Sequence, residues 1–268
     1  CAEKLQIIDL PGIYSLSSGA EDEAVARDFL LNAKPDLVVN VIDSANIERN
    51  LFLSTQLIEM RVPLLFVFTR KDIADKKDIT VDIDRLKQKL ASQVLFVSSL
   101  DKSDMTLLRD TISELVCSVK NPIPNIMYPD EIEAFLTKYD KAFAGKSGNE
   151  FERRWLLVSY AAGDNWAKKI AEQITDFPAK EIKHDIDRIS ALHHDDMEVL
   201  IADARFAYIH GIIHDSVHYR LSRHDFTDTI DRLVLHSFFG LPFFLDDTEF
   251  ALTGRCHVQL FCQLPVDA

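Results

Sequence analysis

The sequence predicts an α/β fold in which a doubly wound parallel sheet is followed by an all-helical domain. Up to about residue 118, short apolar runs alternate with segments of helical periodicity, whereas after residue 125 only helical periodicity recurs. Two prolines within residues 121–124 separate the two parts, because proline cannot continue a helix. We therefore expect a first domain over residues 1–120 and a helical domain over residues 121–228.

Four strands are expected in the first domain, at residues 5–9, 37–42, 64–68 and 94–97. Each is a short apolar run, and the run at 37–42 is nearly unbroken, which is typical of a parallel sheet covered on both faces. In such a sheet the carboxyl ends of the strands meet at one edge, and ligands bind in the loops that follow them. The residues that follow these strands therefore form the candidate site.

The expected helices are segments whose apolar residues recur with the helical period. In the first domain these segments cover residues 22–32, 46–60, 82–90 and 105–119. In the second domain they cover residues 130–144, 149–162, 167–176, 179–192 and 197–219. Within 46–60, the residues expected to face the sheet are Ile47, Leu51, Leu53, Leu57 and Ile58.

The first candidate loop follows the strand at residues 5–9. Asp9 is followed by Leu10, Pro11 and Gly12, a D-x-x-G pattern. A carboxylate at this place can hold the water shell of Mg²⁺, and a glycine N–H can approach a terminal phosphate because no Cβ is in the way. Taken alone, the pattern more often marks a plain turn. The sequence contains no G-x-x-x-x-G-K-[ST] phosphate-binding loop.

Two later loops favour a guanine nucleotide. The strand at residues 64–68 is followed by Thr69, Arg70, Lys71 and Asp72, at the place and spacing of the guanine-reading N-K-x-D motif. Asp72 would accept two hydrogen bonds from the base, whereas Thr69 replaces an asparagine and weakens the match. The alternative interpretation of Asp72 is a solvated loop carboxylate.

The third loop follows the strand at residues 94–97. Here Ser98 and Ser99 would turn backbone N–H groups toward the guanine O6, with Ser98 the better match. Ordinary serines at a strand end are the alternative. The three loops in this order predict a site for GTP or GDP and Mg²⁺, in which Asp9 holds the metal through water.

The sequence is similar to a known family over nearly its whole length. The resemblance rests on four motifs: D-L-P-G-I-Y-S-L at residues 9–16, N-V-I-D-S-A-N-I-E-R-N-L at 40–51, I-A-D-A-R-F at 201–206 and the segment 231–242. They resemble the bacterial ferrous iron transport protein B (FeoB) family from about residue 4 to residue 245. The resemblance implies a Ras-like G domain, incomplete at its N-terminus, and a helical regulatory domain that tunes nucleotide release.

The resemblance also implies a cellular location and a set of partners for the protein. In the family these domains precede a membrane domain that carries Fe²⁺, so we expect the GTP-binding regulatory part of a ferrous iron transporter at the cytoplasmic face of the bacterial inner membrane. Guanine nucleotide, the membrane domain and further copies of the protein are the implied partners. Fe²⁺ is the ion that the whole family transports and is not expected to bind this chain.

Hydrolysis of GTP is uncertain from the sequence. Ile13 occupies the position where Ras-like enzymes keep a water-orienting glutamine, and an apolar side chain cannot orient water. The family is a slow GTPase, and we assign no catalytic residue.

The expected sheet lacks a strand. In Ras-like G domains, the strand that carries the phosphate loop lies between the strand that ends at Asp9 and the one that ends at Asp43. We expect either that residues 5–9 pair directly with residues 37–42, or that an unpaired slot makes the chain prone to aggregate.

The C-terminal region departs from the family. Residues 229–245 resemble the juxtamembrane approach to the first membrane helix, but residues 246–249 read D-D-T-E and the remainder to residue 268 does not resemble the family. A charge at the centre of a membrane helix costs about 2.5 to 3.5 kcal/mol. We therefore expect a cytoplasmic fragment that cannot itself transport iron.

Composition narrows the function further. The formal net charge of −13 disfavours a nucleic-acid partner, which would need a basic face. The four cysteines, Cys1, Cys117, Cys256 and Cys262, have no metal-ligand spacing and are expected to be reduced. His210, His214 and His218 recur every fourth residue. A metal site is one interpretation, and a solvated helix flank is the favoured one.

Two other functions stay open. One is a soluble Ras-like GTPase of another class that acts on ribosome or RNA assembly, which the acidic charge disfavours. The other is an inactive remnant or interaction module with no chemistry.

Overall fold

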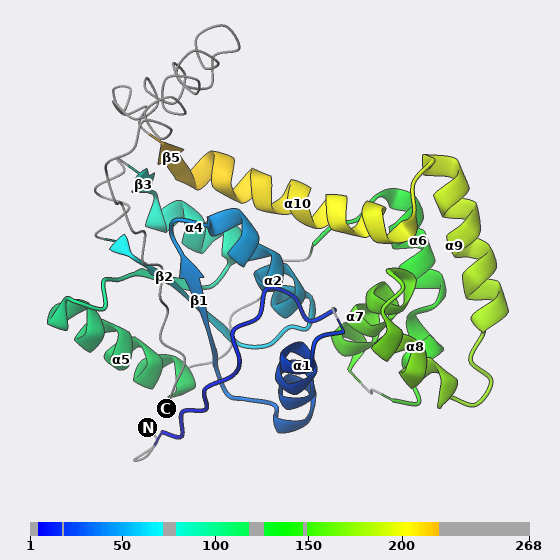
Figure 1. The fold of residues 1–268 in the computed structure, drawn as a ribbon, viewed down its shortest axis with the longest axis horizontal. Coiled ribbons are helices and arrows are strands. Elements are labelled where there is room, and N and C mark those ends of the chain that lie inside the picture. Colours follow the sequence, from blue (N-terminus) through cyan, green and yellow to red (C-terminus); the bar gives the residue numbers. More distant parts are fainter. Residues whose placement is uncertain (1–4, 18, 72–78, 118–125, 147–148, 220–268) are drawn as a thin grey trace, which may run out of the picture. The chain divides into compact units, whose positions relative to one another are not determined.

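The computed structural model describes residues 5–17, 19–71, 79–117, 126–146 and 149–219 (Figure 1). All of them lie in one compact unit, Cys1–Arg220. The expected juxtamembrane segment 229–245 and the tail 246–268 lie outside the described residues. Among the helices that are described, none has the length and apolar character needed to cross a membrane.

A three-stranded parallel sheet forms the first part of the fold. Its strands are β1 (Val38–Asp43), β2 (Leu64–Thr69) and β4 (Gln93–Phe96), in the order β1-β2-β4. The register pairs Asp43 with Thr69 and Phe68 with Phe96, so the strands end together at one edge. The first five residues of β2 are buried, as expected for a central strand covered on both faces. The predicted parallel sheet is confirmed.

Helices cover both faces of this sheet (Figure 1). On one face lies α2 (Ile47–Glu59), an amphipathic helix, while α1 (Glu21–Ala33) and α4 (Ile83–Leu90) join the same core. On the other face α5 (Lys102–Cys117) packs against Leu65 and Val67 of β2. Of the five α2 residues expected to face the sheet, four are buried and Leu53 is half-buried.

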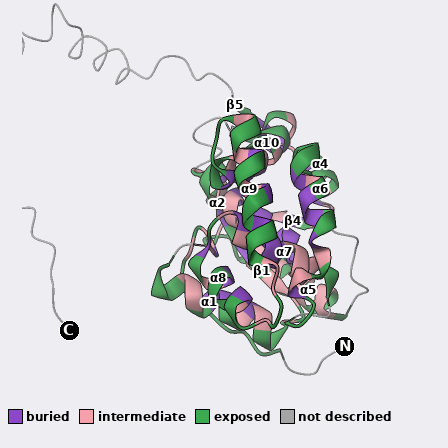
Figure 2. Cartoon of the chain, turned by 90° about the vertical axis from the view of Figure 1, so that its right-hand side faces the viewer, coloured by how far each residue is buried: buried purple, intermediate pink, exposed green. Residues whose placement is uncertain are grey.

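The second part is helical, as predicted. It contains α6 (Asp130–Lys138), the 3-10 turn η1 (Asp140–Phe143), α7 (Glu150–Ala161), α8 (Asn165–Glu172), α9 (Ala179–His193) and α10 (Met197–Ser216). Side chains cap two of the helices, because Asn149 and Asp164 accept hydrogen bonds from the first backbone N–H groups of α7 and α8. The central helix α7 buries five consecutive residues from Trp155 to Ser159, whereas α9 is exposed along its outer face (Figure 2).

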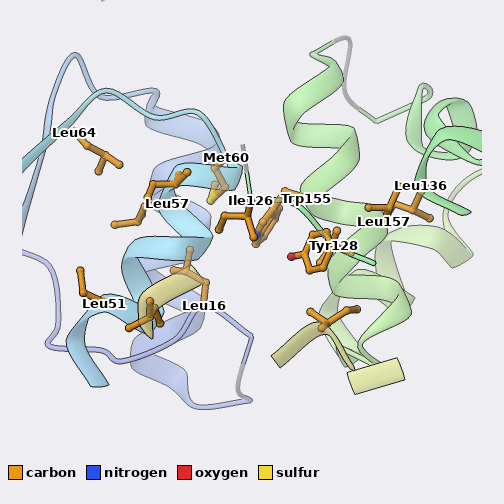
Figure 3. Close-up of a cluster of buried hydrophobic side chains, with 14 of the residues drawn as sticks. Leu16, Leu51, Leu57, Met60, Leu64, Ile126, Tyr128, Leu136, Trp155 and Leu157 are labelled. Atoms are coloured by element: carbon orange, nitrogen blue, oxygen red, sulfur yellow. The ribbon is translucent and has the colours of Figure 1, made fainter. Parts of the chain in front are cut away.

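The two parts share one hydrophobic core. Leu57 and Met60 at the end of α2 belong to the same buried cluster as Ile126 and Trp155 (Figure 3). Tyr128 lies close to them in the sequence and donates a hydrogen bond from its hydroxyl to Glu59. The segment after the 121–124 break is therefore bound to the end of α2.

The predicted strand at residues 5–9 is wrong. This segment is irregular, and Leu5, Ile7 and Ile8 are 36%, 84% and 49% exposed. It does not pair with β1, and among the described residues β1 bonds only to β2. A strand is stabilised by its partners, and an apolar run without a hydrogen-bonded neighbour has nothing to hold it in a sheet.

A small antiparallel ribbon was not predicted. The strand β3 (Ile79–Val81) pairs with β5 (Val217–Tyr219), so the expectation of no strand after residue 125 is wrong. The predicted helix 197–219 ends at Ser216, because Val217 takes an extended conformation with φ −121° and ψ 118°. The ribbon continues in a hydrogen bond of 2.7 Å from the Asp82 N–H to the Ser216 carbonyl.

Candidate functional site

A hydrogen-bonded cluster forms where β1 and β2 end. One Asp43 carboxylate oxygen accepts from the Ala45 N–H at 2.9 Å. The other accepts from Asn46 Nδ2 at 3.1 Å and from Arg70 Nη1 at 3.0 Å. The side chain of Asp43 thereby joins the loop after β1 to the loop after β2. Sequence analysis missed this pairing, although an aspartate directly after an apolar strand was visible.

The Asp43 carboxylate is stabilised in its charged form. Partial burial alone would raise its pKa, but the hydrogen bonds from Ala45, Asn46 and Arg70, together with the positive charge of Arg70, hold the pKa below its usual value. The pair with Arg70 is half open to solvent, since the side chains are 28% and 48% exposed. At neutral pH the cluster is therefore an ion pair and not a proton donor.

Thr69 and Arg70, the first two residues of the predicted base-reading motif, are both bound to β1. The Thr69 hydroxyl donates to the Ile42 carbonyl at 3.2 Å, and the Thr69 carbonyl accepts from the Ser44 hydroxyl. Arg70 has φ +62°, a left-handed conformation that is uncommon for a residue with a Cβ. Lys71 is half-buried, and Asp72 lies outside the described residues.

The Ser98 loop lies beside the end of β2. The Val97 N–H donates to the Phe68 carbonyl at 2.8 Å, which extends the β2–β4 pairing to the residue before Ser98. The Ser98 N–H already donates to Asp104 at 2.9 Å, and its hydroxyl accepts from the Leu100 N–H at 3.3 Å. Ser99 is exposed, and its N–H has no hydrogen bond within the described residues.

In the D-x-x-G segment, Asp9 and Gly12 are exposed to solvent. Asp9 is exposed and forms no hydrogen bond or ion pair to another described residue, so none of the described groups competes for its carboxylate. Leu10 packs against the core, and Pro11 is half-buried. A Cβ built on Gly12 would meet nothing within 4 Å, so the described residues leave that position free. No described contact joins Asp9 to Thr69 or Ser98.

The residues after Gly12 are firmly anchored. Leu16 is fully buried, and its N–H donates to Gln56 Oε1 at 2.6 Å. Gln56, itself fully buried on α2, donates from Nε2 to the Ser17 hydroxyl at 2.7 Å. Arg27 of α1 donates to the Leu16 carbonyl at 2.8 Å. The loop is therefore bound through its backbone to α1 and α2.

This anchor continues into the helical part. The Arg27 guanidinium lies 4.5 Å from the centre of the Trp166 ring, and that ring is 5.8 Å from the ring of Trp155. Such cation–π and ring contacts are strongest where water is excluded, and both Arg27 and Trp155 are buried. A contiguous set of contacts thus joins the loop after the D-x-x-G segment to α7 and α8. The sequence did not predict this set of contacts. Its only signal was the polar residues Arg27 and Gln56 within two segments of helical periodicity.

A pocket of about 560 Å³ lies beside the same loop. Its walls come from Tyr14 and Ser15, from Ala45 and Asn46 in the loop after β1, from the first turns of α2 and from Phe206 of α10. The Arg49 guanidinium lies 3.8 Å from the centre of the Tyr14 ring, and Phe52 and Phe206 are 5.2 Å apart between ring centres. Tyr14 and Phe206 of α10 therefore line the same pocket, each packed against a side chain of α2.

The histidine row does not converge. His210 Nδ1 lies 3.3 Å from Glu48, and His214 Nδ1 lies 3.2 Å from Asp215. The two histidine side chains are 62% and 89% exposed. Within the part of the chain that the structure describes, no three metal-ligating side chains come together.

Comparisons with known proteins agree with this geometry. A family model described as "Ferrous iron transport protein B" matches residues 1–112, and one described as "FeoB cytosolic helical domain" matches residues 128–218. The Fe(2+) transporter FeoB of Salmonella typhimurium strain LT2 is 31% identical over 255 residues, and that of Escherichia coli K12 is 30% identical over 254. Each match covers 90% of this chain, which spans 31% of the length of these relatives.

Solved structures are similar as well. NFeoB of S. thermophilus bound to GDP·AlF4⁻ and K⁺ aligns with a TM-score of 0.68 and 27% identity over 76% of this chain and 79% of that one. The cytosolic domain of the T. maritima FeoB iron transporter in its GMPPNP form aligns with a TM-score of 0.65 and 25% identity, over 79% and 80% of the two chains. Both of these solved structures hold a guanine nucleotide or its analogue.

Proposed function

Because this chain belongs to the FeoB family of ferrous iron transport proteins, we propose that it is the guanine-nucleotide-binding regulatory part of an Fe²⁺ transporter. In this role it couples the nucleotide state to iron uptake through a membrane domain at the bacterial inner membrane. The observation that supports the proposal most is the edge of the sheet where Thr69, Arg70 and Ser98 lie together. Ligands of open parallel sheets bind at this edge, and the similar solved G domains hold guanine nucleotides.

The site residues have distinct proposed roles. Asp9 holds Mg²⁺ through water, and the N–H of Gly12 meets the terminal phosphate, flanked by Leu10 and Pro11. The exposure of Asp9 and Gly12 in the structure is compatible with these roles. Asp72 accepts from the guanine N1–H and the exocyclic amine, and gives the site its base specificity.

The other base contacts come from neighbouring loops. Thr69, Arg70 and Lys71 position the loop that carries Asp72, and Ser99 offers a free N–H toward the guanine O6. Ser98 supports this turn, since its own N–H is taken up by Asp104. This division of roles between the two serines reverses the preference for Ser98 that the sequence alone favoured.

The same proposal covers the organisation of the chain. Residues 1–120 form the G domain, residues 121–228 the helical regulatory domain, residues 229–245 the juxtamembrane segment and residues 246–268 a tail unlike the family. The contacts through Arg27 and Trp166 are the route by which the D-x-x-G loop would influence the helical domain. The membrane domain is the partner that such a change would reach.

We further propose that this chain binds nucleotide weakly. A phosphate-binding loop supplies a nest of backbone N–H groups and a lysine, which carry most of the affinity for phosphate, and the sequence contains no such motif. Base contacts and Mg²⁺ alone are left to hold the ligand. The second candidate function, an interaction module without chemistry, is favoured only if base specificity is absent as well.

Titration of the 268-residue chain with fluorescent GDP and GTP in the presence of Mg²⁺ tests both statements. We expect binding weaker than about 10 µM that unlabelled GDP competes and unlabelled ADP does not. Binding of micromolar affinity or tighter would contradict the weak-binding proposal alone. Equal competition by GDP and ADP, or no binding at millimolar nucleotide, would contradict the nucleotide function itself.

A further inference from the structure

The two base-reading loops are joined by a segment that lies along the end of α10. Residues 73–97 separate the loop with Thr69 and Arg70 from the loop with Ser98, and the structure describes 79–97 of them as β3, α4 and β4. The strand β4 pairs with β2 in the sheet, whereas β3 pairs with β5 and α4 packs against α10. The connection between the two loops is therefore bound to the last described residues of the helical part.

Backbone contacts fix the start of this connection. In the β3–β5 ribbon Val81 lies opposite Val217, and one residue further on the Asp82 N–H donates to the Ser216 carbonyl at 2.7 Å. The Asp82 side chain in turn accepts from the Arg85 N–H and so caps α4. The first turn of α4 is thereby tied to the end of α10.

Asp215 of α10 contacts both ends of α4. Its carbonyl accepts from Arg85 Nη1 at 3.0 Å, and its carboxylate forms an ion pair of 2.6 Å with Lys89 Nζ. The contacts with Lys89 and His214 lower the pKa of Asp215 to about 2, so the carboxylate is charged at neutral pH. Two turns earlier on α10, the Tyr208 hydroxyl donates to the Lys89 carbonyl at 3.4 Å.

An apolar core lies beneath these polar contacts. Leu86 and Leu90 of α4 are fully buried and belong to the same cluster as Val217 of β5 and Val94 of β4. Moving α4 away from α10 would expose these side chains to water, which opposes such a movement. The end of α10, α4 and β4 are therefore packed as one continuous unit, and β4 ends just before the Ser98 loop.

We propose that the end of α10 and β5, residues 208–219, positions the two base-reading loops, with Asp215 as a positioning residue. This inference rests on the proposed function, because it assumes that guanine binds at these loops. It is separate from the Arg27 contacts, which start at the D-x-x-G loop and lead to α7 and α8. Coupling between sites is reciprocal, so a base that orders the loops would also order the ribbon, directly before the proposed juxtamembrane segment.

Hydrogen exchange of the full chain without nucleotide tests the positioning by itself. Asp215→Lys places two like charges together at Lys89 and should speed exchange at residues 79–86 about threefold. If the end of α10 positions the loops, the hydrogen-bonded N–H groups of Val97 and Ser98 should also exchange faster. Adding Lys89→Asp restores an ion pair of reversed polarity and should bring the exchange rates back.

Two further variants are matched controls. Asp203→Lys makes the same change of charge on the same helix, at an exposed residue that forms no hydrogen bond or ion pair with another described residue. Asp215→Glu keeps the charge, and both controls should exchange as the unmodified chain does. If circular dichroism shows that Asp215→Lys does not fold, Asp215→Asn takes its place. Faster exchange confined to residues 79–86, or an equal change with Asp203→Lys, would overturn the proposal.

The preference for GDP over ADP is the second measurement. Phosphates and Mg²⁺ are common to both nucleotides, so the ratio of their affinities reports only the base contacts. Asp215→Lys should lower this ratio about fivefold, whereas a purely structural role of Asp215 would leave the ratio unchanged, which would overturn the proposal. If the unmodified chain itself shows no preference for GDP, the proposed function fails, and the exchange measurement still decides whether the end of α10 positions the loops.

Discussion

Arg205 on α10 and Glu59 at the end of α2 form an ion pair of 2.8 Å whose side chains are only 5% and 3% exposed. Glu59 also accepts a hydrogen bond from the Tyr128 hydroxyl, so three segments meet at one carboxylate. Burial would lower the pKa of Arg205, but the charge of Glu59 raises it well above its usual range. Burial also raises the pKa of the Tyr128 hydroxyl, helped by the negative charge of Glu59, which keeps the hydroxyl a donor.

Removing Arg205 should therefore be strongly destabilising. Arg205→Ala leaves the Glu59 carboxylate buried without its cation, which typically costs about 3 to 5 kcal/mol of unfolding free energy. Urea unfolding followed by circular dichroism measures this. The control is Lys89→Ala, which removes a more exposed ion pair to Asp215 and should cost at most about 1 kcal/mol. Similar losses of unfolding free energy in both variants would contradict a strong stabilising role for the buried Arg205–Glu59 pair.

Gln56→Leu should release the loop after the D-x-x-G segment. The substitution puts an apolar side chain of similar size in place of the amide and leaves the buried Leu16 N–H unpaired, at a cost of about 1 to 3 kcal/mol. Hydrogen exchange at residues 13–17 should become faster than in the unmodified chain. Gln88→Leu on the exposed side of α4 is the control, and equal exchange in the two variants would show that Gln56 is not the anchor.

The Asp43 cluster predicts a dependence of stability on pH. Its pKa is lower in the folded than in the unfolded state, so the ionised carboxylate stabilises the fold at neutral pH, and this contribution is lost as the pH falls below about 4 toward the folded pKa. Asp43→Asn should lower the Tm at pH 7, and the difference from the unmodified chain should shrink as the pH falls below about 4. A difference that is constant with pH would argue against a charged role.

Thr69→Asn should strengthen nucleotide binding. Threonine uses its hydroxyl on the Ile42 carbonyl, whereas an asparagine amide can bond both the backbone and the base. One added hydrogen bond of about 1 kcal/mol predicts roughly a fivefold gain in affinity for GDP. Competition titrations with GDP measure it, and Thr80→Asn, on the exposed surface of β3, is the control. An unchanged affinity would remove Thr69 from the site.

A helix or strand could be predicted from the sequence where the pattern that stabilises it lies within a single segment. The three sheet strands and α2 were predictable, because their apolar patterns reflect burial within a single segment. Residues 5–9 have the same apolar character but pair with no strand among the described residues, and no local pattern contains that information. The three-residue strands β3 and β5 are too short to show a period, and they exist only because they pair with each other.

The polar contacts were hidden for a similar reason. Asp43 and Arg70 are far apart in the sequence, and so are Gln56 and Leu16, so their pairing follows from the register of the strands and the packing of α2. Candidate ligand-binding residues could be named because each follows a strand. Which of their backbone groups are free, as with Ser98 and Ser99, required the three-dimensional structure.

We propose that Asp72 gives this chain its specificity for guanine, and the preference between two bases is the sharpest test of that role. Guanine offers N–H groups that a carboxylate accepts, whereas xanthine has a carbonyl in place of the exocyclic amine, which an amide can donate to. The measurement is the ratio of the affinities for GDP and xanthosine diphosphate, for the unmodified chain and for Asp72→Asn. We predict that the unmodified chain prefers GDP and that Asp72→Asn prefers xanthosine diphosphate, however weak both are. If Asp72→Asn leaves the ratio of the two affinities unchanged, Asp72 does not read the base.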